Sequence, residues 1–172
     1  MLKMAALPRW ARFFLSSCLL LPLAAQAVLT ASVTVPTGFN ATVFPGEVTR
    51  LEITLTNDVS SEITALGFNT SLPSSTNNGL KIAGEATLMD CGSGALTATL
   101  GGTQIKLDGG TIAALSGATP GTCKITVPVK AWSTDGVTSS QTYTIAANVV
   151  SGTQGGSTVK NGYPIFVIET GS

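Results

Sequence analysis

The fold is decided by the stretch Leu51-Glu52-Ile53-Thr54-Leu55-Thr56, in which apolar and polar side chains alternate. Alternate side chains of a β-strand point to opposite faces, so this stretch predicts a strand with one face buried against a second sheet. Pro45-Gly46 before it and Asn57-Asp58 after it are typical turn residues. The sequence therefore marks this strand at both ends.

A second, longer alternation lies in the C-terminal half of the chain. Its apolar positions are Cys123, Ile125, Val127, Val129 and Ala131, with Lys124, Thr126, Pro128 and Lys130 on the other face. Cys123 is therefore expected to face the core, with Cys91 on or beside the opposing layer. Pro128 has no N–H to donate, so we expect this strand to lie at a sheet edge or to be bulged there.

Shorter strands are predicted at residues 32–35, 41–44, 63–70, 95–100, 103–107, 141–149 and 159–170. Gly101-Gly102 stands where a two-residue hairpin turn would join two of them. The run Ile165-Phe166-Val167-Ile168 predicts a strand that is buried on both faces or that meets a partner. Many short strands without helical periodicity predict an all-β fold, an immunoglobulin-like antiparallel β-sandwich.

The N-terminus has the pattern of a bacterial-type secretory signal peptide. Three basic residues, Lys3, Arg9 and Arg12, precede an apolar run at residues 13–25, and Ala25-Gln26-Ala27 follows the pattern small-x-small of a cleavage site. We expect cleavage after Ala27, which makes residues 1–27 the signal peptide and residues 28–172 one β-sandwich domain. The protein is then exported, and it is periplasmic, secreted or held at the cell surface.

Two other interpretations of the N-terminus stay open. A membrane anchor needs about 20 apolar residues, and Pro22 interrupts this run. Lipoprotein processing at Leu15-Ser16-Ser17-Cys18 would leave the lipidated Cys18 followed by an apolar stretch instead of a polar tether. We therefore predict no membrane span in the mature chain.

Removal of the signal peptide changes the charge and the cysteine count. The remaining 145 of the 172 residues carry 6 Lys and Arg against 9 Asp and Glu, a formal charge of −3. Nucleic acid is not expected as a partner, because phosphate binding needs clustered basic side chains. Cys91 and Cys123 remain as an even pair, and an oxidising compartment favours a disulfide between them over two buried free thiols.

Several blocks of the sequence together resemble the bacterial conserved-repeat domain, an immunoglobulin-like module of unknown function in large surface and secreted proteins. The blocks are residues 45–57 (PGEVTRLEITLTN), 68–73 (FNTSLP), 107–112 (LDGGTI) and 121–129 (GTCKITVPV), with Cys91-Gly92 at the place of the family's first cysteine. The resemblance spans nearly the whole mature chain in the right order. It implies a structural or binding role.

The sequence shows no catalytic apparatus, cofactor motif or metal motif. Without histidine, the Ser-His-Asp and Cys-His arrangements and most zinc or copper sites are excluded. Glu47 and Glu52 are five positions apart, and an odd difference in position would put them on opposite faces of a strand. Calcium ligands at Asp108 or at Asn57-Asp58 are less expected than turn residues there, because Asx side chains favour turns.

The remaining candidates for binding are two aromatic residues, Trp132 and Tyr163, for which packing in the sandwich is the competing interpretation. We therefore predict a non-catalytic secreted or cell-surface module with a structural or adhesive role, whose partner is a protein or a glycan. The alternative is a fimbrial or filament subunit that assembles by strand donation. Its apolar terminal strand and its start, Val28-Leu29-Thr30-Ala31-Ser32-Val33, motivate that alternative.

Overall fold

The computed structural model describes residues 29–134, 141–145, 149–162 and 166–170. These residues form twelve strands, and none of them forms a helix long and apolar enough to cross a membrane. The strands are β1 (Leu29–Thr34), β2 (Val48–Asn57), β3 (Ile63–Ser71), β4 (Asn78–Ile82), β5 (Thr87–Met89), β6 (Ala95–Thr97), β7 (Gln104–Ile112), β8 (Gly121–Ser133), β9 (Gln141–Ile145), β10 (Val149–Gln154), β11 (Ser157–Gly162) and β12 (Phe166–Thr170). The signal-peptide prediction, with Cys18, falls outside the described residues.

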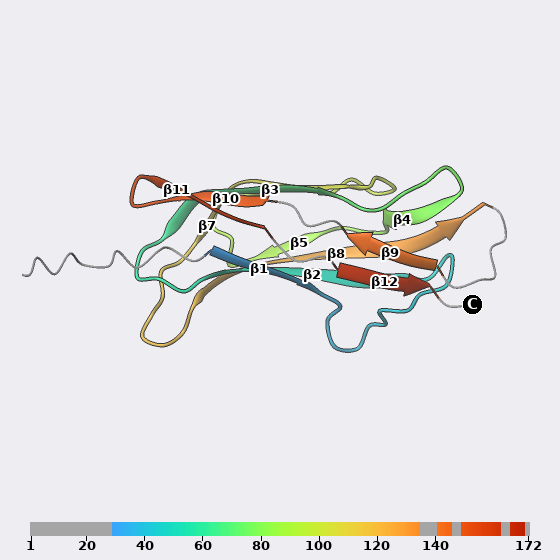
Figure 1. Ribbon diagram of the computed structural model, residues 1–172, viewed down its shortest axis with the longest axis horizontal. Coiled ribbons are helices and arrows are strands. Elements are labelled where there is room, and N and C mark those ends of the chain that lie inside the picture. Colours follow the sequence, from blue (N-terminus) through green and yellow to red (C-terminus); the bar gives the residue numbers. More distant parts are fainter. Residues whose placement is uncertain (1–28, 135–140, 146–148, 163–165, 171–172) are drawn as a thin grey trace, which may run out of the picture.

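The strands are arranged in two antiparallel sheets that pack as layers (Figure 1). The first sheet has the order β1-β2-β8-β4, and β5 also pairs with β8. The second has the order β11-β10-β3-β7-β6, and β9 forms a separate antiparallel pair with β12. The predicted fold class, an immunoglobulin-like antiparallel β-sandwich, is confirmed.

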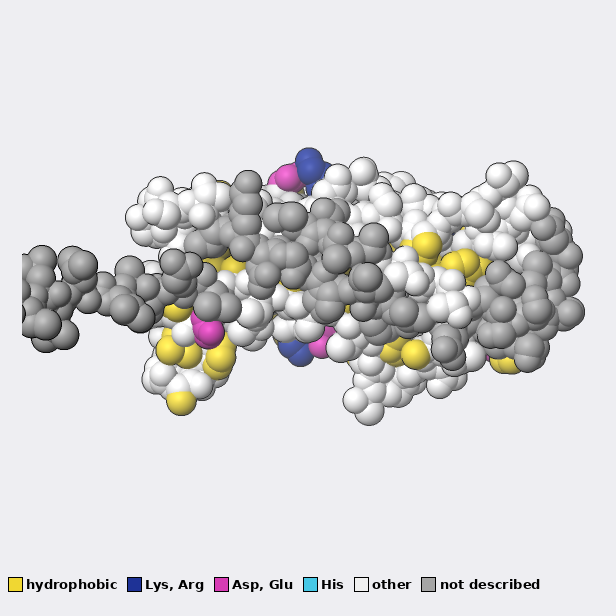
Figure 2. All heavy atoms as spheres, viewed as in Figure 1, with side chains coloured by type: hydrophobic (Ala, Val, Ile, Leu, Met, Phe, Trp, Pro, Cys, Tyr) yellow, Lys and Arg dark blue, Asp and Glu magenta, His cyan; other side chains and the backbone are white. Residues whose placement is uncertain are grey.

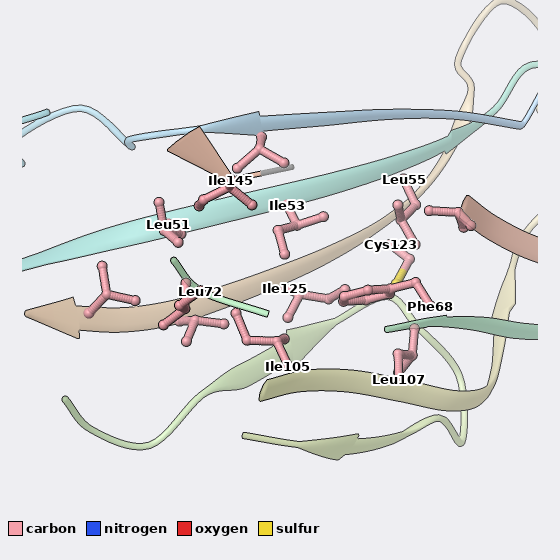
Figure 3. Packing of buried hydrophobic residues seen from close by; sticks show 14 of the residues in the cluster. Leu51, Ile53, Leu55, Phe68, Leu72, Ile105, Leu107, Cys123, Ile125 and Ile145 are labelled. Atoms are coloured by element: carbon pink, nitrogen blue, oxygen red, sulfur yellow. The ribbon is translucent and has the colours of Figure 1, made fainter. Parts of the chain in front are cut away.

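The core lies between the layers and is built from the two predicted alternations. Leu51, Ile53 and Leu55 of β2 are at most 2% exposed, and the five inward residues of β8 from Cys123 to Ala131 are fully buried. Figure 3 shows Ile53 and Ile125 directed toward the opposite layer, where Ile105 and Leu107 of β7 lie. Burying one such aliphatic side chain is worth about 1.5 to 3 kcal/mol, so a one-residue slip of either strand would be costly.

The blocks that carry the family resemblance occupy the inner strands of both sheets. Residues 45–57 and 121–129 contribute β2 and most of β8, which pair over ten positions from Val48↔Lys130 to Asn57↔Gly121. Residues 68–73 and 107–112 contribute the end of β3 and most of β7, which pair with each other in the second sheet. The resembling blocks therefore form the structural centre of the domain.

The expectation that β8 lies at a sheet edge or is bulged at Pro128 is wrong, because β8 is an inner strand and its register with β2 is unbroken through Pro128. β8 has β2 on one side and both β4 and β5 on the other, so it is an inner strand. Pro128 is tolerated because its neighbour is interrupted: β4 ends at Ile82 and β5 begins at Thr87. The carbonyl of Pro128 still accepts a hydrogen bond from the Ala83 N–H at 2.8 Å, and its missing N–H falls beside this break.

The predicted two-residue hairpin at Gly101-Gly102 is also wrong. β6 ends at Thr97 and β7 begins at Gln104, so six residues connect them. The loop is longer because its backbone pairs with β4: the Gly101 N–H donates to the Ile82 carbonyl at 2.8 Å, and the Ile82 N–H donates to the Gly102 carbonyl at 2.9 Å. Within the loop, the Gly102 N–H also donates to the Thr99 carbonyl at 2.9 Å, so the chain turns over residues 99–102 before it enters β7.

Other strand boundaries differ from the predictions. The predicted strand at residues 41–44 belongs to the loop between β1 and β2, although Val43 is buried there. The predicted strand at residues 141–149 is divided into β9 and the first residue of β10. The predicted strand at residues 159–170 is divided into the end of β11 and the whole of β12. β4 and β5 were not predicted. The side chains of residues 165–168, expected to be buried or to meet a partner, lie outside the described residues.

Candidate functional site

The Cys91–Cys123 disulfide joins the two layers at the centre of the sandwich. Cys123 lies in β8 of the first sheet, and Cys91 follows β5 at the point where the chain crosses to the second sheet. The Cys91 carbonyl accepts a hydrogen bond from the Thr111 N–H of β7 at 2.9 Å. Both cysteines are at most 2% exposed, so this bridge is a structural element of the core.

The residue after the first cysteine explains why a Cys-Gly pair stands at this crossing. Gly92 has a φ of +60°, in the left-handed region, and a Cβ placed there would overlap the Thr111 side chain. The crossing segment and β7 are therefore in close contact, which any larger residue at this position would prevent.

Trp132, the predicted binding candidate that the structure describes, lies on β8 beside a lysine. The Lys81 Nζ is 4.1 Å from the centroid of the Trp132 ring, a cation–π contact. The indole Nε1 is buried and has no hydrogen-bond partner. Tyr163, the other aromatic candidate, lies outside the described residues.

Tyr143 of β9 is a buried aromatic residue that sequence reasoning missed. Its side chain belongs to the core cluster and is 8% exposed. Burial raises the pKa of the Tyr143 phenol, while a hydrogen bond with the Gly79 backbone opposes part of the shift. Its alternation with Ile145, which is also buried, was the signal available in the sequence.

Raising the pH is expected to destabilise the protein through Tyr143. In the unfolded chain the phenol ionises near pH 10, while the folded environment holds it neutral, so the folded state loses stability as the pH rises through about 10. We expect the Tyr143→Phe variant to lack this part of the loss. Denaturant unfolding of both proteins at about pH 8 and pH 10.5 measures the change in unfolding free energy between the two pH values. The hydrogen bond that the variant loses lowers its stability equally at both values, so it does not affect this change. An equal decline in both proteins would contradict the burial of the phenol.

Asn57, considered above as a turn residue or calcium ligand, forms a buried hydrogen-bond network. Its Nδ2 donates to the carbonyls of Ser61 at 2.8 Å and Ala113 at 2.9 Å. Its Oδ1 accepts from the Val59 N–H at 3.3 Å and from the Gln154 Nε2 at 3.5 Å. The contact with Val59 is the Asx turn that the sequence favoured, and the contact with Ser61 lies within the same β2–β3 connection. The contacts with Ala113 and Gln154 fasten this connection to distant segments.

The acidic candidates are separated from one another. Asp108 forms an exposed ion pair with Lys106 at 2.7 Å, and Glu52 forms one with Lys124 at 3.3 Å. Glu47 accepts a hydrogen bond from the Phe44 N–H at 2.9 Å in the turn before β2. Within the described ranges, no three metal-binding side chains come together. The structure therefore does not combine Glu47 and Glu52 into one site.

The outer face of the second sheet carries a shallow hollow of about 290 Å³ over β3, β7 and β10. Gly67 and Ser151 leave room at its floor because their side chains are absent or small, and Asn69, Lys106 and Asp108 line it. Among the described residues visible in Figure 2, backbone and side chains that are neither charged nor hydrophobic predominate, and charged groups are few. Such a surface is suited to polar contacts.

Comparison with known proteins identifies the fold and nothing finer. No protein-family model matches the chain, and no curated protein does. Among solved structures, the major pilin subunit BcpA of Bacillus cereus is similar with a TM-score of 0.52 and 10% identity, over 83% of this chain and 40% of the pilin. The major pilin SpaD of Corynebacterium diphtheriae gives 0.49 and 14%, over 81% and 35%. The chain thus spans less than half the length of either pilin. Its fold is that of an immunoglobulin-like β module.

Proposed function

We propose that this chain is a non-catalytic, exported immunoglobulin-like module with a structural or binding role at the cell surface. The observation that carries the proposal is the disulfide between two core cysteines, because disulfides persist in oxidising compartments and are rare in the cytosol. It agrees with the signal-peptide pattern of residues 1–27 and with the resemblance to the conserved-repeat domain.

The character of the outer faces supports a binding or structural role. The outward positions of β1 and β2 include Thr30, Ser32 and Thr34 opposite Thr56, Thr54 and Glu52. A face made mainly of hydroxyl groups offers hydrogen-bond donors and acceptors to a protein or glycan. The BcpA likeness adds that a similar fold forms part of a major pilin subunit of Bacillus cereus.

The filament alternative is the second choice because the terminal strands are already paired. β1 pairs with β2 along six positions, and β12 pairs with β9 along five, all within one chain. Strand donation would require one of these pairs to open. A monomer that refolds cooperatively by itself would support the single-module proposal over an incomplete sandwich.

Expression of the full chain in a bacterial host tests the proposal. We expect a product that begins at Val28 by mass spectrometry, is found outside the cytoplasm, and resists thiol alkylation until it is reduced. The control is the Ala27→Arg variant, which removes the small residue before the cleavage point and should stay uncut there. Full-length, reduced protein confined to the cytoplasm would contradict the proposal.

A further inference from the structure

Six residues form a continuous basic–aromatic surface on the outer face of the first sheet. Strand β8 contributes Lys130 and Trp132, β4 contributes Lys81, β2 contributes Val48 and Arg50, and the β1–β2 loop contributes Phe39. The strand positions face outward because their neighbours along the chain, such as Thr49, Leu80, Val129 and Ala131, are buried. We call this set the basic–aromatic surface.

The strand register brings its three cations close together. Lys130 lies opposite Lys81 on one side and opposite Val48 on the other. Arg50 is two residues beyond Val48 on the same face of β2. Neighbouring strands are about 4.8 Å apart, and residues two apart on one strand are separated by about 7 Å. The three positive charges therefore form a line across three strands.

Aromatic rings restrain the two outer cations of this line. The Lys81 Nζ lies 4.1 Å from the Trp132 ring centroid, and the Arg50 Cζ lies 4.8 Å from that of Phe39. Contact with a ring face limits the freedom of a long side chain while leaving its charge available. The surface is thus ordered before any ligand binds.

Within the part of the chain that the structure describes, no acidic side chain forms an ion pair with this surface. Two ion pairs join described residues, Lys106–Asp108 and Lys124–Glu52, and neither includes Arg50, Lys81 or Lys130. Like charges directly opposite each other destabilise an antiparallel sheet, and Lys81 and Lys130 are such a pair. A general excess of positive charge does not explain them, since the mature chain carries −3. An external polyanion would relieve the repulsion.

We propose that the basic–aromatic surface binds a linear acidic polysaccharide that carries repeated carboxylates. This inference rests on the proposed function, and it names the glycan class that the module would hold. The cations lie in a row on an open sheet face, a geometry that fits an extended polyanion. This surface is separate from the hollow of about 290 Å³, which lies on the outer face of the second sheet over β3, β7 and β10.

The test measures binding of the purified, oxidised protein to alginate, a uronic-acid polymer, at about 50 mM salt. Single variants Arg50→Gln, Lys81→Gln and Lys130→Gln should each weaken binding about twofold to fivefold, as exposed charge pairs do, and the triple variant at least about tenfold. Raising the salt to about 0.5 M should also weaken it. The matched control is Lys106→Gln, which removes the same charge from the outer face of the second sheet and should bind like the wild type.

Other outcomes would overturn the inference. These are equal binding to neutral dextran, an equal loss in Lys106→Gln, or tighter binding to single-stranded DNA or to anionic phosphatidylglycerol vesicles than to alginate. Folding is checked separately, because Lys130→Gln should melt at the same temperature as the wild type or higher once the opposed lysines are relieved. Export without alginate binding would refute this inference alone, whereas cytoplasmic confinement would refute the proposed function.

Discussion

Replacing Cys91 and Cys123 together by alanine will lower the free energy of unfolding by about 3 to 4 kcal/mol. The bridge closes a loop with a sequence separation of 32, and its loss restores that conformational freedom to the unfolded chain. It also releases Cys91 from its position between β8 and β7. For a domain of this size we expect the melting temperature to fall by roughly 10 °C.

Calorimetry of wild type and variant under oxidising conditions measures this effect. Cys18→Ala is the matched control, because Cys18 lies in the predicted signal peptide, and it should leave the melting temperature of the protein without that segment unchanged. Wild type treated with reductant should approach the double variant. A double variant that melts together with oxidised wild type would show that the bridge does not stabilise the fold.

Changing Asn57 to aspartate is expected to cost about 3 kcal/mol or more at neutral pH. The amide Nδ2 donates to the Ser61 and Ala113 carbonyls, and a carboxylate oxygen in its place would face two acceptors. Asn57 is fully buried, so water cannot compensate. The substitution preserves shape, which isolates the hydrogen-bond pattern from packing.

The same variant should show a defined pH dependence. In the unfolded chain the new carboxyl ionises near pH 4, whereas the folded site favours the neutral acid, so its pKa is raised by folding. The deficit relative to wild type therefore grows as the pH rises from about 4 toward 7. Urea unfolding at both pH values measures it. The exposed Asn77→Asp is the control, and a similar deficit in both variants would refute the role assigned to Asn57.

The strands with strong alternation could be predicted from the sequence because burial decides their register. In β2 and β8 every second residue enters the core, and each such side chain adds to the penalty for a slip. Asn57 shows where the same signal was overlooked. It continues the inward positions of Leu51, Ile53 and Leu55, but its residue type favours a turn, which hides this continuation in the sequence.

The remaining features depend on contacts that no local pattern contains. The break between β4 and β5 accommodates Pro128, which lies more than 40 positions later in the chain. The loop after β6 takes its conformation from backbone bonds to Ile82. Likewise, Trp132 could be chosen as an aromatic candidate, but the line of cations beside it follows from the register of β4, β8 and β2. Such relations require the assembled sheet.

The disulfide also has a mechanical consequence for a module under tension. It encloses β6, β7 and the beginning of β8 in a covalent loop, so force applied to the two ends of the chain bypasses these segments. When force unfolds the whole domain, the enclosed residues do not contribute to the length of the stretched chain. The maximal extension of the oxidised domain is therefore shorter than that of the reduced domain by roughly 110 Å. The oxidised module thus has a covalent limit on how far it can be drawn out before the chain becomes taut.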